Sequence, residues 1–173
     1  KDGSARFALM DYAAATIAPR TNLAFQLVRR AGELAQAPAQ ASIKVVENTG
    51  SISIDTGRLR WVFSKERFSF AEEIHFAGRE WIGGRESDAT VLDTTGQVYR
   101  ASRGEYRITI EEQGPHRVTV LIEGEFRNPL RRFMNYKARV TFVAGGSQVH
   151  LSHTIRNREP GREGRDVLRW GIT

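Results

Sequence analysis

Short alternations of apolar and polar residues, separated by turn-forming residues, constrain the fold of this chain more than any other feature. An alternation with a period of two places the apolar side chains on one face of a β-strand. The pattern is clearest at residues 51–54, 59–64, 106–111, 118–123, 140–143 and 149–155. Turn signals such as Asn48-Thr49-Gly50 and Ala144-Gly145-Gly146 lie between these segments. The sequence therefore predicts an all-β domain, a sandwich or barrel of about a dozen short and mostly antiparallel strands.

The same alternation predicts which side chains form the core. A chain of 173 residues is long enough to bury a substantial core within one domain. We expect ten apolar side chains to be mostly buried, namely Trp61, Phe63, Phe76, Ile108, Ile110, Val118, Val120, Ile122, Phe142 and Ile155.

We interpret residues 1–173 as a single β domain. Its expected parts are an N-terminal hairpin at 1–30, a connector at 31–41, the main sheets at 42–157 and a tail at 158–173. Gly32 and Pro38 interrupt the helix-favouring composition around the connector, so we expect no long helix there. The charged tail ends in one more predicted strand, Val167–Ile172.

The first residues have the pattern of a strand whose partner is missing. Asp2-Gly3 is typical of a tight hairpin turn, and strand residues follow it at once, with no initiator Met or signal peptide in front. We expect Arg6–Asp11 to pair with Asn22–Arg29 and also to need an earlier strand. The sequence is therefore expected to be a segment of a larger protein.

Composition excludes some kinds of chemistry and favours one kind of partner. Cysteine is absent, which excludes disulfides, cysteine-based zinc sites and thiol catalysis. The formal net charge is +6, and arginine greatly outnumbers lysine. Guanidinium groups bind carboxylates and phosphates through two parallel hydrogen bonds, which suits an acidic polysaccharide or a nucleic acid. A GC-rich genome that encodes Arg in place of Lys is the alternative explanation. No apolar run is long enough for a membrane span, so no membrane contact is predicted.

One segment, 127–139, concentrates positive charge without any acidic residue. Basic side chains with aromatic rings between them suit an anionic glycan or single-stranded nucleic acid. The candidate carbohydrate-binding residues are Arg127, Arg131, Arg132, Tyr136, Lys137 and Arg139. The alternative is a loop between two strands whose Arg pair meets acids elsewhere in the fold. Nucleic acid is the weaker candidate partner, because the positive charge is confined to one segment and no nucleic-acid-binding motif is present.

The motif Asp55-Thr56-Gly57 matches the catalytic loop of aspartic proteases, in which two aspartates share a proton. Arg58 follows it where a small residue is usual, and its charge would keep the carboxylate ionised. We therefore predict an Asx-type turn between two strands.

Histidine and glutamate pairs in the sequence are candidate metal or acid–base sites. His150 and His153 are three residues apart, so a strand sends them to opposite faces and they cannot share one metal ion. His153 is predicted to be a core histidine with satisfied hydrogen bonds. Glu123 and Glu125 do share a face, where a ladder of charged pairs is a better interpretation than a pair of hydrolytic carboxylates. No metal and no cofactor are predicted.

Several short motifs occur in an order that resembles the exo-rhamnogalacturonan lyase-like family. They are Asp2-Gly3-Ser4-x-Arg6, Asp55-Thr56-Gly57-x-Leu59-x-Trp61, Glu111-Glu112-x-Gly114-Pro115-x-Arg117, Arg139-Val140-Thr141-Phe142-x-Ala144-Gly145 and His153-Thr154-Ile155-x-Asn157. The chain resembles the N-terminal domain of these proteins, a RIFT-barrel-type β domain. The resemblance covers roughly Asp2 to Asn157.

The resemblance implies that the elimination chemistry of such lyases takes place in a separate α-helical toroid. No part of this sequence resembles that toroid, which needs several long amphipathic helices. The resemblance therefore implies no catalytic residue in this chain, although its parent resembles a polysaccharide lyase. It implies a β domain that acts in docking of substrate, or of the catalytic helical domain of the same parent chain.

The resemblance also implies a secreted or periplasmic protein of pectin degradation whose partner is an acidic polysaccharide. The alternative function is a structural or carbohydrate-binding module of a surface or virion assembly. These two functions differ in the expected oligomeric state and in the salt dependence of glycan binding.

Overall fold

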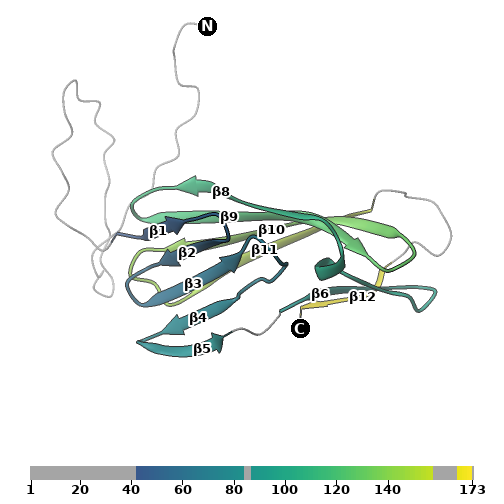
Figure 1. Ribbon diagram of the computed structural model, residues 1–173, viewed down its shortest axis with the longest axis horizontal. Coiled ribbons are helices and arrows are strands. Elements are labelled where there is room, and N and C mark those ends of the chain that lie inside the picture. Colours follow the sequence, from purple (N-terminus) through teal and green to yellow (C-terminus); the bar gives the residue numbers. More distant parts are fainter. Residues whose placement is uncertain (1–41, 84–86, 158–166, 173) are drawn as a thin grey trace, which may run out of the picture. The chain divides into compact units, whose positions relative to one another are not determined.

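The computed structural model describes residues 42–83, 87–157 and 167–172, and these residues form twelve β-strands and one 3-10 turn (Figure 1). The prediction of an all-β domain with about a dozen strands is confirmed. All the strand pairs are antiparallel. The expected hairpin at 1–30 and connector at 31–41 lie outside the described residues. Over the described ranges, no helix reaches the length and apolar content needed to cross a membrane.

The first sheet has five strands that lie side by side in sequence order. They are β1 (Lys44–Glu47), β2 (Ser51–Asp55), β3 (Leu59–Ser64), β4 (Glu73–Phe76) and β5 (Arg79–Gly83). Short turns join them, as expected for a meander of antiparallel strands. Strand β5 is an edge strand, because the described residues give it no partner except β4.

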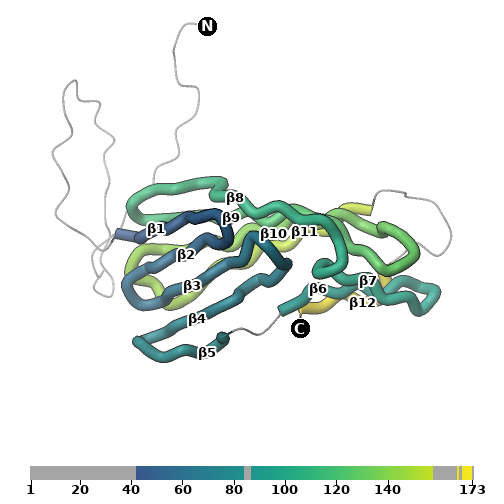
Figure 2. The backbone as a smooth tube through the Cα atoms, in the orientation of Figure 1, coloured from purple at the N-terminus to yellow at the C-terminus, as the bar shows by residue number. Residues whose placement is uncertain are grey.

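The second sheet has seven strands in the order β11-β10-β9-β7-β6-β12, and β8 also pairs with β9. They are β6 (Ala89–Asp93), β7 (Val98–Arg100), β8 (Tyr106–Gln113), β9 (Arg117–Arg127), β10 (Arg132–Val143), β11 (Val149–Asn157) and β12 (Val167–Ile172). The 3-10 turn η1 (Ala101–Arg103) connects β7 to β8, and Figure 2 follows the backbone through this turn. The predicted strand Val167–Ile172 is confirmed as β12, which pairs with β6.

The two sheets pack face to face, so the fold is a sandwich. The ring of Phe142 on β10 meets the rings of Trp61 and Phe63 on β3, at centroid distances of 5.8 and 6.0 Å. Of the ten predicted core side chains, six are buried, namely Phe63, Ile108, Val118, Val120, Ile122 and Phe142. The other four, Trp61, Phe76, Ile110 and Ile155, are half-buried and pack against this core.

A cluster of aromatic rings extends the core toward β11 and β12. The imidazole of His153 stacks on Tyr136 at 5.7 Å and on Trp170 at 4.8 Å. His153 is thus a core histidine as predicted. Its Nε2 has no hydrogen-bond partner among the described residues, so the expectation of satisfied hydrogen bonds is wrong there. Burial lowers the pKa of His153 to about 4. The imidazole is therefore neutral at neutral pH, which is compatible with its stacking between two apolar rings.

The Asp55-Thr56-Gly57 motif forms the predicted Asx-type turn between β2 and β3. The backbone N–H of Gly57 donates to Asp55 Oδ1 at 2.7 Å, and Gly57 has a φ of 89°. Buried Thr56 donates its hydroxyl to the carbonyl of Gly146 at 2.7 Å. The motif therefore joins two strands and ties their turn to the Gly145-Gly146 turn before β11, as a structural element.

Candidate functional site

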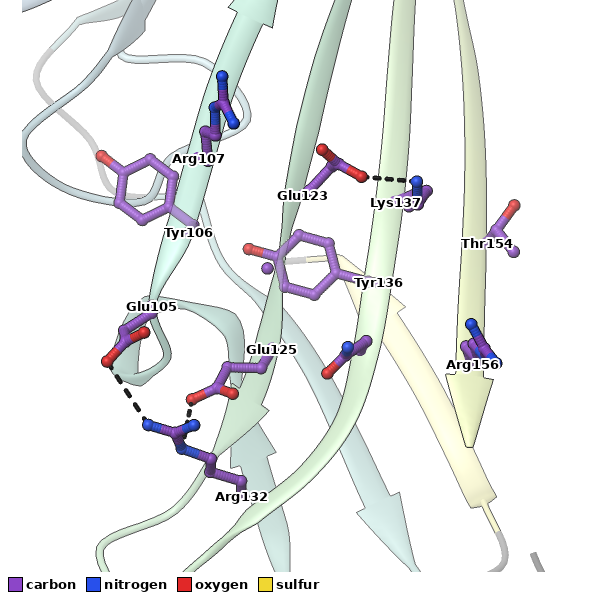
Figure 3. A pocket seen from close by; sticks show the side chains of 12 residues that line it. Glu105, Tyr106, Arg107, Glu123, Glu125, Arg132, Tyr136, Lys137, Thr154 and Arg156 are labelled. Carbon is purple, nitrogen blue, oxygen red and sulfur yellow. Dashed lines mark ion pairs between the residues drawn. The ribbon is translucent and has the colours of Figure 1, made fainter. Parts of the chain in front are cut away.

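A groove of about 600 Å³ lies along strands β8 to β11 of the second sheet (Figure 3). We call it the charged groove, because seven of its lining residues are acidic or basic. It is lined by Glu105, Tyr106, Arg107, Glu123, Gly124, Glu125, Arg132, Asn135, Tyr136, Lys137, Thr154 and Arg156.

One row of this groove crosses four neighbouring strands in register. Arg107 on β8 pairs with Glu123 on β9, Glu123 with Lys137 on β10, and Lys137 with Thr154 on β11. The next residues along these strands, such as Ile108, are buried in the core. Because alternate residues of a strand point to opposite faces, the row lies on the face of the sheet that points away from the core.

Ion pairs occupy the middle of the charged groove. The ammonium of Lys137 lies 2.6 Å from a carboxylate oxygen of Glu123. Arg132 lies 3.1 Å from Glu125 and 3.5 Å from Glu105, and Figure 3 shows its guanidinium between the two carboxylates. The predicted ladder of charged pairs on the Glu123 and Glu125 face is therefore confirmed. These carboxylates are neutralised by neighbouring cations.

Two arginines of the charged groove are exposed and have no hydrogen-bond or ion-pair partner among the described residues. They are Arg107 on β8 and Arg156 on β11, at opposite sides of the Glu123–Lys137 pair. Three strand spacings of about 4.8 Å separate β8 from β11, so the two strands are roughly 14 Å apart. The groove thus presents two free guanidinium forks with a neutralised centre between them.

Tyr136 fills space at the charged groove and does not act there as a titrating group. Its side chain is only 1% exposed, and burial raises the pKa of its hydroxyl above the ordinary value. Its ring lies against Gly124 on β9, where an added Cβ would collide with the Tyr136 hydroxyl and approach the carbonyl of Glu105 to 2.8 Å. The glycine at position 124 therefore provides the space that the tyrosine ring fills.

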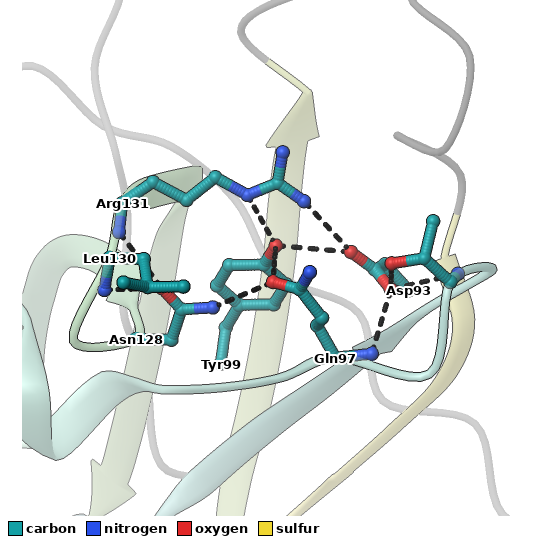
Figure 4. Close-up of polar contacts among 7 residues, drawn as sticks. Asp93, Gln97, Tyr99, Asn128, Leu130 and Arg131 are labelled. Atoms are coloured by element: carbon teal, nitrogen blue, oxygen red, sulfur yellow. Dashed lines mark hydrogen bonds and ion pairs between the residues drawn. The ribbon is translucent and has the colours of Figure 1, made fainter.

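Arg131 takes part in a different, structural network (Figure 4). Its Nε donates to the Tyr99 hydroxyl at 2.6 Å, and its Nη2 lies 3.2 Å from Asp93, which is fully buried. Burial alone would raise the pKa of Asp93, but hydrogen bonds from Thr95, Gln97 and Tyr99 outweigh it and lower that pKa. Arg131 thus compensates a buried carboxylate at the turn between β6 and β7.

The other predicted carbohydrate-binding residues lie outside the charged groove. Arg139 makes two hydrogen bonds to Glu111, at 2.6 and 2.8 Å. Arg127 is half-buried at the end of β9, where it is in register with Arg100 and Arg132. The structure therefore brings three of the six candidates, Arg132, Tyr136 and Lys137, into one groove.

Sequence reasoning missed Arg107, Thr154 and Arg156, because they belong to strands that are distant from the basic segment in sequence. A signal for them does exist in the alternation, since each is the outward-facing neighbour of a predicted core position. Assigning them to the same site also requires the strand order, which the local pattern does not contain. Within the described ranges, no three His, Asp or Glu side chains come together as a metal-binding group.

Comparison with known protein families gives a match. The family model described as the PcRGLX-like protein central beta sandwich domain matches residues 43–163, more than half of the chain. No curated protein matches the sequence. The match agrees with the family expected from the short motifs, but it corrects the domain. The matching domain is the central β-sandwich, whereas the motifs had suggested an N-terminal RIFT-barrel-type domain. The two packed sheets agree with this correction.

Proposed function

The chain belongs to the PcRGLX-like family of rhamnogalacturonan lyase-like proteins, as their central β-sandwich domain, and we propose that it holds an anionic polysaccharide in the charged groove. The domain is proposed to be non-catalytic and to act beside a helical catalytic domain of the same parent chain. The parent is proposed to be a secreted or periplasmic protein of pectin degradation.

The free guanidinium groups of Arg107 and Arg156 are the observation that carries this proposal. A uronate carboxylate accepts two parallel hydrogen bonds from an arginine fork, and such charge-assisted bonds are stronger than neutral ones. Most other cations along these strands already have acidic partners, for example Lys137 with Glu123 and Arg139 with Glu111. Arg107 and Arg156 can therefore bind a carboxylate without first breaking an ion pair.

The carboxylates of the charged groove make a nucleic acid a poor ligand. Glu105, Glu123 and Glu125 line the same groove, and a phosphate backbone carries a charge at every nucleotide. Tyr136 is buried, so its ring gives no face on which a base could stack. A pectic chain in which uronates alternate with neutral sugars carries less charge, and its hydroxyl groups can hydrogen-bond to Thr154 and Asn135.

The test is binding of rhamnogalacturonan oligosaccharides to the 173-residue chain by isothermal titration calorimetry. Arg107→Gln and Arg156→Gln should each weaken binding by about tenfold or more, because a charge-assisted hydrogen bond contributes on the order of 1.5–3 kcal/mol. Raising the salt concentration should weaken binding further. A neutral galactan of similar length should bind more weakly than the uronate-containing chain.

Arg79→Gln is the matched control for these variants. Arg79 is exposed on β5 of the other sheet and lies outside the charged groove, so its variant should bind like the unmodified chain. Absence of binding, or equal losses in all three variants, would contradict the proposal. Defined oligomers in light scattering without any glycan binding would favour an assembly module instead.

A further inference from the structure

A second groove, of about 330 Å³, lies where the edge of the first sheet meets the start of β11. We call it the edge groove. Its walls are mainly aromatic and aliphatic, with Trp61, Phe76, Trp81, Ile82 and Val149 among them. Ser147 is the one polar side chain among the described residues that line it. None of the charged side chains of β4 and β5 lines it.

A β-bulge in β5 places Trp81 in this groove. Ile74 on β4 pairs with Ile82, and His75 pairs with Glu80, so the register passes over Trp81. Without the bulge, Trp81 and Ile82 would point to opposite faces of the sheet. The bulge turns both side chains toward the edge groove, which is a known effect of bulges at sheet edges.

The Trp81 side chain is not needed to protect the sheet edge. A bulge and charged residues already prevent an edge strand from pairing with another chain, and β5 has both, with Arg79 and Glu80 beside the bulge. Trp81 is nevertheless 69% exposed. Its ring lies edge-on to that of Phe76, with the two ring centroids 6.1 Å apart. An exposed aromatic ring over an apolar groove marks a surface that a partner covers.

We propose that a neighbouring domain of the same parent chain covers the edge groove and places an uncharged apolar side chain against Trp81. Two observations identify this occupant. The family model describes a central domain, so in this family the sandwich has neighbours along the chain. Among the described residues, those that line the groove carry no charge, which favours an apolar partner over a polyanion.

Covalent linkage makes such a small contact sufficient. A tethered domain is present at an effective concentration of the order of millimolar, so each contact needs to contribute little free energy. Interfaces between domains of one chain are also small, about 600–1,500 Å². This inference depends on the family assignment and on Trp81. It is independent of the glycan proposed for the charged groove.

Hydroxyl-radical footprinting of Trp81 tests the proposal. The 173-residue chain is compared with the protein encoded by its complete reading frame, and oxidation is measured by mass spectrometry. Oxidation of Trp81 should be slower in the longer protein, on the order of fivefold or more, because a covered ring is protected. Leu130, 85% exposed on the loop before β10, is an internal reference within each sample.

Substitutions then connect the protection to docking. In the longer protein, Trp81→Arg should separate one cooperative unfolding transition into two, whereas Leu130→Arg adds the same charge at another exposed apolar site and should leave one transition. Equal oxidation of Trp81 in both proteins would overturn the proposal, as would a reading frame that adds no further domain. Protection of the isolated chain that rises with its concentration would instead identify a second copy as the occupant. Protection that requires added oligosaccharide would identify a glycan, and either result overturns the proposal.

Discussion

The charged groove and the edge groove lie on the same sandwich, but they differ in which side chains remain without a partner. In the charged groove, neighbouring ions neutralise most charges, and only Arg107 and Arg156 lack a partner among the described residues. In the edge groove, apolar surface is exposed to solvent, above all the ring of Trp81. A solvated ion-pair surface suits a ligand that exchanges with water, whereas exposed aromatic surface suits a partner that stays bound.

The largest effect should come from the core that supports the edge groove. Phe142→Ala removes a fully buried ring that contacts Trp61, and large-to-small changes of this kind cost about 3–5 kcal/mol. Chemical denaturation should show this loss in the free energy of unfolding. Val143→Ala, at the exposed neighbouring position, should change it by less than about 1 kcal/mol. Similar losses in both variants would contradict the prediction that burial of Phe142 stabilises the core beneath the edge groove.

Acid should destabilise the folded chain through His153, on the side of the sandwich that carries the charged groove. Burial lowers the pKa of His153 in the folded state to about 4, from an ordinary value of 6.5. The unfolded chain therefore binds a proton more readily, and this contribution to stability is complete above about pH 6.5 and is lost as the pH falls toward 4. The loss is at most on the order of 3 kcal/mol.

The variant that checks this prediction is His153→Gln. Its stability relative to the unmodified chain should become more favourable as the pH falls from 7 to 4, in denaturation curves recorded across that range. His150→Gln, at the exposed histidine of the same strand, is the matched control. Because His153 stacks on Tyr136 and Trp170, a fluorine label on Trp170 should respond to acid before one on Trp81.

Gly124→Ala should disturb the charged groove and leave the edge groove unchanged. The added Cβ would collide with the Tyr136 hydroxyl and lie 2.8 Å from the Glu105 carbonyl, so the expected loss of stability is about 1–3 kcal/mol. Gly114→Ala is the control, since its Cβ would make an ordinary contact of 3.5 Å. Thermal unfolding distinguishes the two variants. Glycan affinity should fall in Gly124→Ala, while Trp81 oxidation should stay unchanged.

Arg139→Gln should have the smallest effect. The Arg139–Glu111 pair is exposed, and such surface pairs contribute little to stability because solvent screens them. Since Arg139 lies outside the charged groove, calorimetry should show nearly unchanged glycan affinity. A tenfold loss of affinity would mean that the binding surface follows the basic segment of the sequence rather than the groove.

The basic segment shows why the candidate site was only partly predictable. Its charges were identified from the sequence, but Arg131 turned out to compensate the buried Asp93, which precedes it by 38 residues. Arg107 and Arg156 reach the charged groove from strands on either side of β9 and β10. Pairing of strands decides these associations, and local periodicity does not contain that information.

The sequence by itself determined the all-β class, the strand Val167–Ile172, the Asx-type turn at Asp55 and most of the core. Each of these depends on interactions between residues close in the chain, or on alternation along one strand. Within the described ranges, the tertiary structure alone decided which cations remain unpaired and how the bulge directs Trp81. It also decided that the Nε2 of half-buried His153 has no hydrogen-bond partner there. These features depend on strand order and on packing between the sheets, because burial and ion pairing are set by neighbours that are distant in sequence.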